Sequence, residues 1–169
     1  MKQTMSVLTS QTTCEWYTPP HIIERARRAL GSIDLDPASA DVPQRWIRAA
    51  EYYSLTSVMS GLARPWFGRV WLNPPFDATP LWLDRLDEAY LAGSVSAAVA
   101  LVNSAPGYIW WETLIRQRPV VLLRDRLRFV RADGTVGGQA KKGQTVAWFG
   151  ADNWRLIDAF SDLGRLLLP

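Results

Sequence analysis

Residues 95–102 constrain the fold most, because they form a nearly continuous apolar run of strand length. A strand without polar alternation is buried on both faces, which is typical of a central strand in a sheet that helices cover on both sides. The run is far shorter than the roughly 20 apolar residues of a membrane-spanning helix. These residues therefore predict an α/β protein built around one fully buried strand.

Helical and extended patterns alternate along the rest of the chain. We expect helices at 18–30, 40–53, 79–93, 107–117 and from Asp152 to about Gly164, with Thr18 as the first N-cap and Gly31 as the C-terminal end of that helix. We expect strands at 32–36, 69–72, 95–102, 119–123, 126–130 and 144–149, and irregular structure at 55–66. This order predicts a mainly parallel sheet with helices on both faces.

The chain has 169 residues, the size of one minimal domain. Residues 1–13 are polar and without periodicity, so we expect a flexible tail followed by one folded domain, 14–169. The single cysteine, Cys14, excludes an intramolecular disulfide and zinc sites of paired cysteines, and no metal site is expected. No secretory signal or membrane-spanning run is present, which favours the cytoplasm.

Tryptophan and arginine are both abundant: the chain has 9 Trp, and 16 Arg against 3 Lys, with a net charge of +3. Arginine pairs with phosphate and aromatic rings stack on bases, so one interpretation is a nucleic-acid surface. The other is a tryptophan-filled core and a GC-rich genome. The basic residues after residue 115 face few acids, which favours a phosphate surface. That basic stretch comprises Arg116, Arg118, Arg124, Arg126, Arg128, Arg131, Lys141 and Lys142.

Asn73-Pro74-Pro75-Phe76 directly follows the strand expected at 69–72. Two consecutive prolines stiffen the backbone and remove two N–H donors, which leaves the Asn73 side-chain oxygen and the Pro74 carbonyl as acceptors beside the Phe76 ring. This arrangement suits a flat group with an amine, such as adenine or cytosine. A rigid turn without function would have the same four residues.

The Asn73–Phe76 loop resembles the D/N/S-P-P-Y/F/W motif of amino-methyltransferases that use S-adenosylmethionine. Over roughly 16–150 the chain resembles the compact, phage-type DNA N-6-adenine-methyltransferases, which are Dam-like. The other segments that carry the resemblance are Trp16-Tyr17-Thr18-Pro19 with Ile22 and Ile23, Asp34-Leu35-Asp36-Pro37-Ala38-Ser39, the G-L…W-x-G-x-V stretch from Gly61 to Val70, and Arg126-Leu127-Arg128-Phe129.

The chain departs from the family pattern at several positions. Ser60 stands where the family usually has Asp before Gly-Leu, and Asp125 replaces Gly before Arg126. Residues 103–106 lack the Arg that is common there, and no G-x-G loop follows the first expected strand. These departures keep open a catalytically silent protein that binds nucleic acid.

The resemblance implies a Rossmann-like, S-adenosylmethionine-dependent methyltransferase fold over 14–169 and methyl transfer to the N6 amino group of adenine in DNA after base flipping. Asn73, Pro74, Pro75 and Phe76 would be catalytic. Asp36 would contact the methionine amino group or the ribose, although it could instead cap a helix, and Asp34 is a second choice or a solvated strand residue. Trp16 would stack on the cofactor or pack in the core. The expected cofactor-binding residues are Trp16, Tyr17, Thr18, Pro19, Asp34, Asp36, Pro37, Ala38 and Asn73.

The resemblance also implies a phage- or prophage-encoded protein in the bacterial cytoplasm, acting on double-stranded DNA. The expected DNA contacts are Arg124, Arg126, Arg128, Lys141 and Lys142, with 132–143 as a flexible basic loop over the DNA. The chain has no room for a separate recognition domain, so sequence specificity would come from loops at 132–143 or 77–80, or from a second subunit in a homodimer. Cytosine N4, adenine in RNA and a protein glutamine remain alternative substrates.

Overall fold

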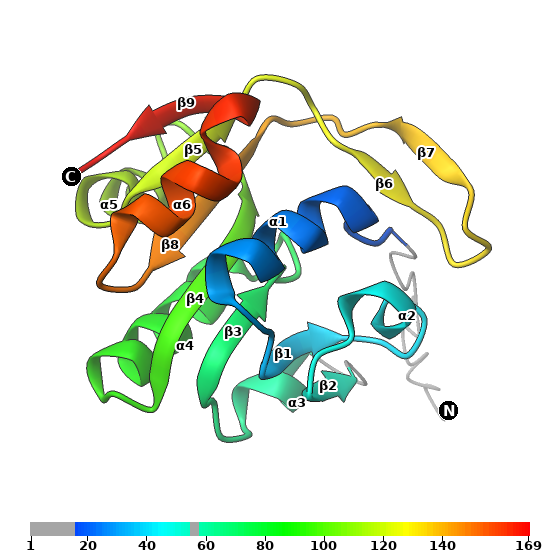
Figure 1. Ribbon diagram of the computed structural model, residues 1–169, viewed down its shortest axis with the longest axis horizontal. Coiled ribbons are helices and arrows are strands. Elements are labelled where there is room, and N and C mark those ends of the chain that lie inside the picture. Colours follow the sequence, from blue (N-terminus) through cyan, green and yellow to red (C-terminus); the bar gives the residue numbers. More distant parts are fainter. Residues whose placement is uncertain (1–15, 55–57) are drawn as a thin grey trace, which may run out of the picture.

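A computed structural model of the chain describes residues 16–54 and 58–169; the expected tail at 1–13 and Cys14 lie outside them. A seven-stranded sheet forms the centre, in the order β2-β1-β3-β4-β8-β5-β9 (Figure 1). The strands are β1 (Leu35–Ser39), β2 (Glu51–Ser54), β3 (Gly68–Leu72), β4 (Val95–Asn103), β5 (Val120–Leu123), β8 (Gln144–Phe149) and β9 (Gly164–Leu167).

The sheet is parallel on one side of β4 and antiparallel on the other. β1, β2, β3 and β4 pair in parallel, whereas the pairs β4–β8, β8–β5 and β5–β9 are antiparallel. β5 therefore runs in the direction of β1–β4, and only β8 and β9 run against them. The α/β class and the central buried strand at 95–102 are confirmed, but the expectation of a mainly parallel sheet holds for only one half.

Helices cover both faces of the sheet, as expected. α1 (Pro20–Leu30) and α6 (Asn153–Phe160) pack on the face that includes Trp71, Val99 and Leu101. α4 (Thr79–Leu91) and α5 (Ile109–Gln117) pack on the opposite face, against Ala98, Ala100 and Val102. Alternate residues of β4 thus enter two different cores, which is why that strand has no polar face.

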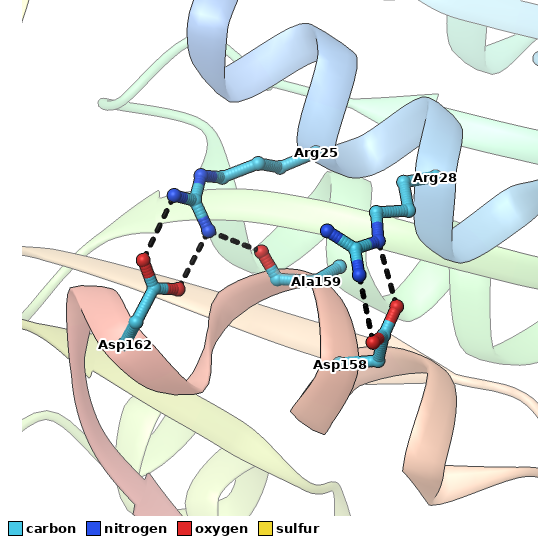
Figure 2. A network of polar contacts seen from close by, with 5 residues as sticks. All are labelled: Arg25, Arg28, Asp158, Ala159 and Asp162. Carbon is cyan, nitrogen blue, oxygen red and sulfur yellow. Dashed lines mark hydrogen bonds and ion pairs between the residues drawn. The ribbon is translucent and has the colours of Figure 1, made fainter.

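Ion pairs join α1 to the C-terminal helical segment on the outside of the first face (Figure 2). Arg25 forms two hydrogen bonds with Asp162 and one with the Ala159 carbonyl, and Arg28 forms two with Asp158. These pairs are exposed, so each contributes only about 0–1 kcal/mol to stability. The apolar contacts beneath them, from Ile22, Ala26 and Phe160, hold the helices more strongly.

A two-stranded hairpin projects from the body of the molecule between β5 and β8 (Figure 1). Its strands are β6 (Arg128–Val130) and β7 (Val136–Gln139), and they are antiparallel. The turn at Asp133-Gly134 is where the sequence predicts it, with Gly134 at φ +85°. The expectation of a flexible loop over 132–143 is wrong at residues 136–139, because their backbone pairs with β6.

Three predictions in the first third of the chain are wrong. β1 continues through Pro37 to Ser39, because its register against β2 is irregular between Asp36 and Ser39 and tolerates a residue without an N–H. The helix expected at 40–53 is only α2 (Gln44–Ile47), which ends at Arg48 with a positive φ of 50°; β2 follows. The N-cap of α1 is Pro19 and not Thr18.

Two further elements differ from expectation. α3 (Val58–Leu62) lies within the segment expected to be irregular. The last helix ends at Phe160, and after a short 3-10 turn (Ser161–Leu163) the chain forms β9 at the sheet edge. The first residue of β9 is Gly164, and only glycine fits there, because a Cβ would lie 1.9 Å from the Leu122 carbonyl oxygen. In the described part of the chain, we find no helix with the length and apolar character to cross a membrane.

Candidate functional site

The carboxyl ends of β1, β3, β4 and β5 meet at one edge of the sheet, because these strands share a direction. In open α/β sheets this edge is where ligands bind. Asn73 follows β3 directly, and Leu35 pairs with Val70, so Asp36 lies about two residues, roughly 7 Å, short of Asn73 along the strand axis. Alternation points both side chains to the face that carries α1 and α2.

Asn73 is held by a single hydrogen bond that leaves its oxygen without a partner. Its Nδ2 donates to Oγ1 of Thr18 over 3.0 Å, and Thr18 is 2 % exposed. The Oδ1 of Asn73 is buried and has no hydrogen-bond partner among the described residues. A buried acceptor without a donor costs roughly 1–3 kcal/mol. This atom is therefore suited to receive a proton donor from a bound molecule.

The rest of the loop places a second acceptor and an aromatic ring beside Asn73. The Pro75 carbonyl accepts from Ala78 N, and the Phe76 carbonyl accepts from Thr79 Oγ1, which fixes the start of α4. The Pro74 carbonyl accepts no hydrogen bond from the described residues. Phe76 is 45 % exposed, and its ring makes a T-shaped contact with Phe129, with centroids 6.2 Å apart. Phe76 is thus supported by β6 while part of its surface remains open to a ligand.

The segment before α1 is tied to three different elements. Tyr17 pairs through its backbone with Val130 of β6. The Thr18 carbonyl accepts a hydrogen bond from the Trp46 indole at 3.0 Å, and the Trp46 ring lies edge-on to Tyr17. Residues 16–19 therefore lie between the hairpin, α2 and the Asn73 loop, so the expected cofactor-binding segment meets the expected catalytic residue Asn73 through Thr18.

Asp36 is a buried acid, 2 % exposed. Its carboxyl group accepts hydrogen bonds from Gln44 Nε2 at 2.8 Å and from Ala38 N at 3.4 Å. Burial raises the pKa of Asp36 to about 7, although these hydrogen bonds act to lower it. No cation pairs with Asp36 among the described residues. With a pKa of about 7, its carboxyl group exists in both the protonated and the charged form near neutral pH. Pro37 and Ala38 continue β1 beyond it.

Asp34 lies apart from this group, at the opposite end of β1. Both its oxygens bind the Arg69 guanidinium at 2.8 and 2.9 Å, and one also accepts from Arg69 N. These contacts hold the pKa of Asp34 below its usual value. Gly68, at φ +66°, makes the approach feasible, because a Cβ there would lie 2.6 Å from the Asp34 carboxylate. The structure does not bring Asp34 together with Asn73.

Trp16 packs on the hairpin and is not part of either core. Its ring lies so close to Gly137 that a Cβ there would be 2.0 Å from Trp16 Cζ3. The Arg131 guanidinium sits over the ring, 4.9 Å from its centroid. Trp16 is 39 % exposed. By contrast Trp82 and Trp111 are buried, in agreement with the core positions that tryptophan content suggested.

The arginines divide into two groups. Nine form ion pairs within the described residues: Arg25, Arg27, Arg28, Arg48, Arg64, Arg69, Arg85, Arg118 and Arg155. Arg118, which the sequence placed in the basic stretch, binds Asp87 and lies against Phe149, so it is structural. Of the seven arginines without an ion pair in the described part, Arg45, Arg116 and Arg165 lie elsewhere on the surface, whereas the hairpin and its stem carry Arg124, Arg126, Arg128 and Arg131, beside the exposed Lys141 and Lys142.

Sequence reasoning missed three residues that build the site: Gln44, Trp46 and Phe129. Phe129 stands within the Arg126–Phe129 segment already noted for its resemblance, but only the fold shows that it supports Phe76. Gln44 and Trp46 belong to a segment that was expected to be a long helix. Their contacts with Asp36 and Thr18 cross eight and 28 residues of sequence, and no local pattern indicates them.

Comparison with known proteins gives one family. The family model for DNA N-6-adenine-methyltransferase (Dam) matches residues 5–153, which include every residue placed in the site above. A search of curated proteins finds no match. Because the family model covers most of the chain, this protein belongs to the DNA N-6-adenine-methyltransferase (Dam) family.

Proposed function

We propose that this chain transfers a methyl group from S-adenosylmethionine to the N6 amino group of adenine in double-stranded DNA, after the base has been flipped out of the duplex. The observation that carries the proposal is the buried Oδ1 of Asn73, which has no partner among the described residues, next to a Pro74 carbonyl that accepts no hydrogen bond from those residues and to the exposed Phe76 ring. Family membership supplies adenine N6 as the acceptor.

The residues of the site fit S-adenosylmethionine. Asp36 is a buried acid without a cationic partner among the described residues, and the cofactor carries a methionine ammonium group. The cofactor supplies, when bound, a methyl group activated by a sulfonium. We propose a Rossmann-like methyltransferase fold for 14–169, with these residues around the cofactor: Trp16, Tyr17, Thr18, Pro19, Asp36, Pro37, Ala38 and Asn73. Among them Asp36 supplies the polar contact, whereas Thr18 and Asn73 bond each other and border the cofactor without a polar contact to it. Asp34 is left out, because Arg69 already occupies both its oxygens.

The protein's own groups would act by orientation. Asn73 Oδ1 and the Pro74 carbonyl accept the two protons of the adenine amine, which draws the nitrogen lone pair out of conjugation with the ring and aims it. Phe76 stacks on the flipped base; such stacking contributes about 1–3 kcal/mol per base. Placing two reactants in line accounts for much of the rate of a transfer that needs no strong base.

DNA would lie across the hairpin and its stem. Arg124, Arg126, Arg128, Lys141 and Lys142 are exposed and would contact phosphates, which position the duplex without reading its sequence. The hairpin also touches the base-binding loop through Phe129. Base flipping is required because the amine is unreachable within the stack. We propose that sequence recognition comes from the segments at 132–143 or 77–80, or from a second copy in a homodimer. A phage or prophage origin and a place in the bacterial cytoplasm also remain predictions.

The experiment is to incubate the protein with labelled S-adenosylmethionine and unmethylated duplex DNA, then to digest the DNA and identify the labelled nucleoside. We expect the label in N6-methyldeoxyadenosine. Label in N4-methyldeoxycytidine, or transfer to RNA or protein in place of DNA, would replace the proposed substrate. DNA binding without transfer to any of these would indicate a catalytically silent nucleic-acid-binding protein.

A further inference from the structure

Thr18 has a different role from the one that its motif implies. The resemblance places Thr18 against the cofactor, yet its Oγ1 accepts the hydrogen bond from Asn73 Nδ2 at 3.0 Å. Thr18 is also the residue whose carbonyl is bound by Trp46, so both its side chain and its backbone are fixed. The geometry points to Thr18 as a positioning residue that holds the Asn73 side chain by its Nδ2, so that Oδ1 is left for the substrate; this inference rests on the proposed function.

The two ends of an amide are chemically opposite, and only one suits the amine. Oδ1 accepts hydrogen bonds, whereas Nδ2 only donates them. If the amide turned by half a rotation, its NH2 would face the adenine NH2, and neither could accept from the other. The Thr18 hydroxyl receives a proton of Nδ2, and Oδ1 is left without a partner among the described residues. A methyl group at residue 18 would remove the one acceptor that Nδ2 has among the described residues, so the Asn73 side chain would no longer be held.

The supports of Thr18 show how its placement is maintained. Arg27 donates to the Trp46 and Ile47 carbonyls, which anchors α2 on α1. Trp46 then holds the Thr18 carbonyl, and Tyr17 continues into the hairpin. Because Thr18 is only 2 % exposed, water does not readily replace Asn73 as the partner of its hydroxyl. The Asn73 side chain is thus held in place before DNA arrives.

The test compares Thr18→Val and Thr18→Ser with the wild type in single-turnover methylation at saturating cofactor and DNA. Valine keeps the shape and removes the acceptor, so we expect the transfer rate to fall about 10- to 100-fold. The dissociation constants for S-adenosylmethionine and DNA should stay within about 2-fold. Serine should restore most of the rate. A Thr18→Val rate equal to that of the wild type, or a loss explained by weaker cofactor binding, would overturn the inference.

Two further measurements keep the outcome clear. Thr145 is a fully buried threonine whose hydroxyl bonds Ser104 and Trp111, so Thr145→Val controls for the general effect of removing a buried hydroxyl and should leave the transfer rate unchanged. The side-chain NH2 resonances of Asn73 should shift in Thr18→Val and not in Thr145→Val. If Thr18→Val does not fold, Trp46→Phe, which removes the bond to the Thr18 carbonyl and keeps an aromatic ring beside Tyr17, should also lower the rate. If the wild type transfers no methyl group, the proposed function fails; if it does and these variants match it, only the role of Thr18 fails.

Discussion

At the scale of single residues, the site depends on polar atoms that the fold buries without a full set of partners. Asn73 Oδ1 lacks a donor and Asp36 lacks a cation within the described residues. Buried polar groups are normally satisfied, so such exceptions are typical of places where a ligand completes the structure. Each atom accounts for a different part of the proposal: Asn73 for the amine and Asp36 for the cofactor.

The raised pKa of Asp36, about 7, predicts a pH-dependent affinity for S-adenosylmethionine. A cationic amino group beside Asp36 favours the carboxylate, so binding should release one proton. The dissociation constant should therefore fall as pH rises from about 5.5 to 7, by at most about tenfold per pH unit. This range lies below the pH at which the cofactor's amino group itself loses its proton. Titration calorimetry in buffers of different ionisation enthalpy measures this proton directly.

The control for this prediction is Asp36→Asn, which should bind the cofactor more weakly and with an affinity that is constant over the same pH range. A wild-type affinity that does not change with pH would show that the cofactor's charge is balanced by another residue.

Part of this arrangement could be predicted from residues alone, and the limit is physical. The Asn73–Phe76 loop is local: prolines determine its shape and the following helix start is fixed within six residues. Asp36 and Thr18 were found by resemblance. Gln44, Trp46 and Phe129 act across the fold, through contacts that depend on how α2 and β6 dock, and nothing local in the sequence encodes that docking.

At the scale of elements, the hairpin is the part that departs most from the sequence expectation. Residues 136–139 are rich in glycine and were expected to be loop, but Gly137 is needed as glycine because Trp16 lies on it. The same hairpin supports Phe76 through Phe129 and holds Tyr17 through Val130. It is therefore a structural wall of the site as well as a candidate DNA contact.

Adjacent glycines allow this wall to be tested. Gly137→Ala puts a methyl group where Trp16 stands, whereas a Cβ at Gly138 meets nothing within 4 Å. We expect Gly137→Ala to displace Trp16 and lower kcat/KM several-fold, while Gly138→Ala leaves it unchanged. In a Trp16→Ala background, Gly137→Ala should have no additional effect, since both changes remove one contact. Equal activities of the two glycine variants would contradict the role assigned to Trp16 and the hairpin.

The exposed cations of the hairpin predict the salt dependence of DNA binding. If Arg128 and Lys141 each contact a phosphate, replacing either by Gln should reduce the slope of log K against log salt by about 0.9. Fluorescence anisotropy with a labelled duplex at several salt concentrations measures the slope. Arg165, exposed on β9 and also without an ion pair in the described part, is the matched control, and Arg165→Gln should leave the slope as it is. The same slope for all three variants would place the DNA elsewhere.

At the scale of the whole molecule, one sheet serves two purposes. Its parallel half, β2-β1-β3-β4, brings Asp36 and Asn73 to the same edge and face. Its antiparallel half, β8-β5-β9, completes the core beneath α6. The hairpin is inserted between β5 and β8 of this half. The helices α1, α4, α5 and α6 and the central strands could be predicted because their periodicity is local, whereas α2 and α3 could not. The direction of β8 and the existence of β9 depend on pairing between distant segments, and the sequence pattern is the same for either direction.

Asp36 also links the stability of the whole fold to pH. Its pKa is higher in the folded protein than its ordinary value of 3.8, so the folded state binds the proton more tightly. Its stabilising contribution is complete below about pH 4 and is lost as pH rises through about 7, by up to about 4 kcal/mol. Asp34, whose pKa Arg69 lowers, acts in the opposite direction near pH 4.

The measurement is therefore the difference between the wild type and Asp36→Asn in urea unfolding. The wild type should lose stability relative to Asp36→Asn as pH rises from about 4.5 to about 7.5. A constant difference over that range would mean that Asp36 has an ordinary pKa in the folded protein.

The most direct test of the central claim is the methyl-transfer rate of Asn73→Ala, measured with duplex DNA at saturating S-adenosylmethionine together with the cofactor's dissociation constant. We expect transfer to adenine N6 to be lost, because the amine loses its buried acceptor, while the cofactor's dissociation constant changes little. A wild-type transfer rate in Asn73→Ala would show that Asn73 Oδ1 does not bind the adenine amine.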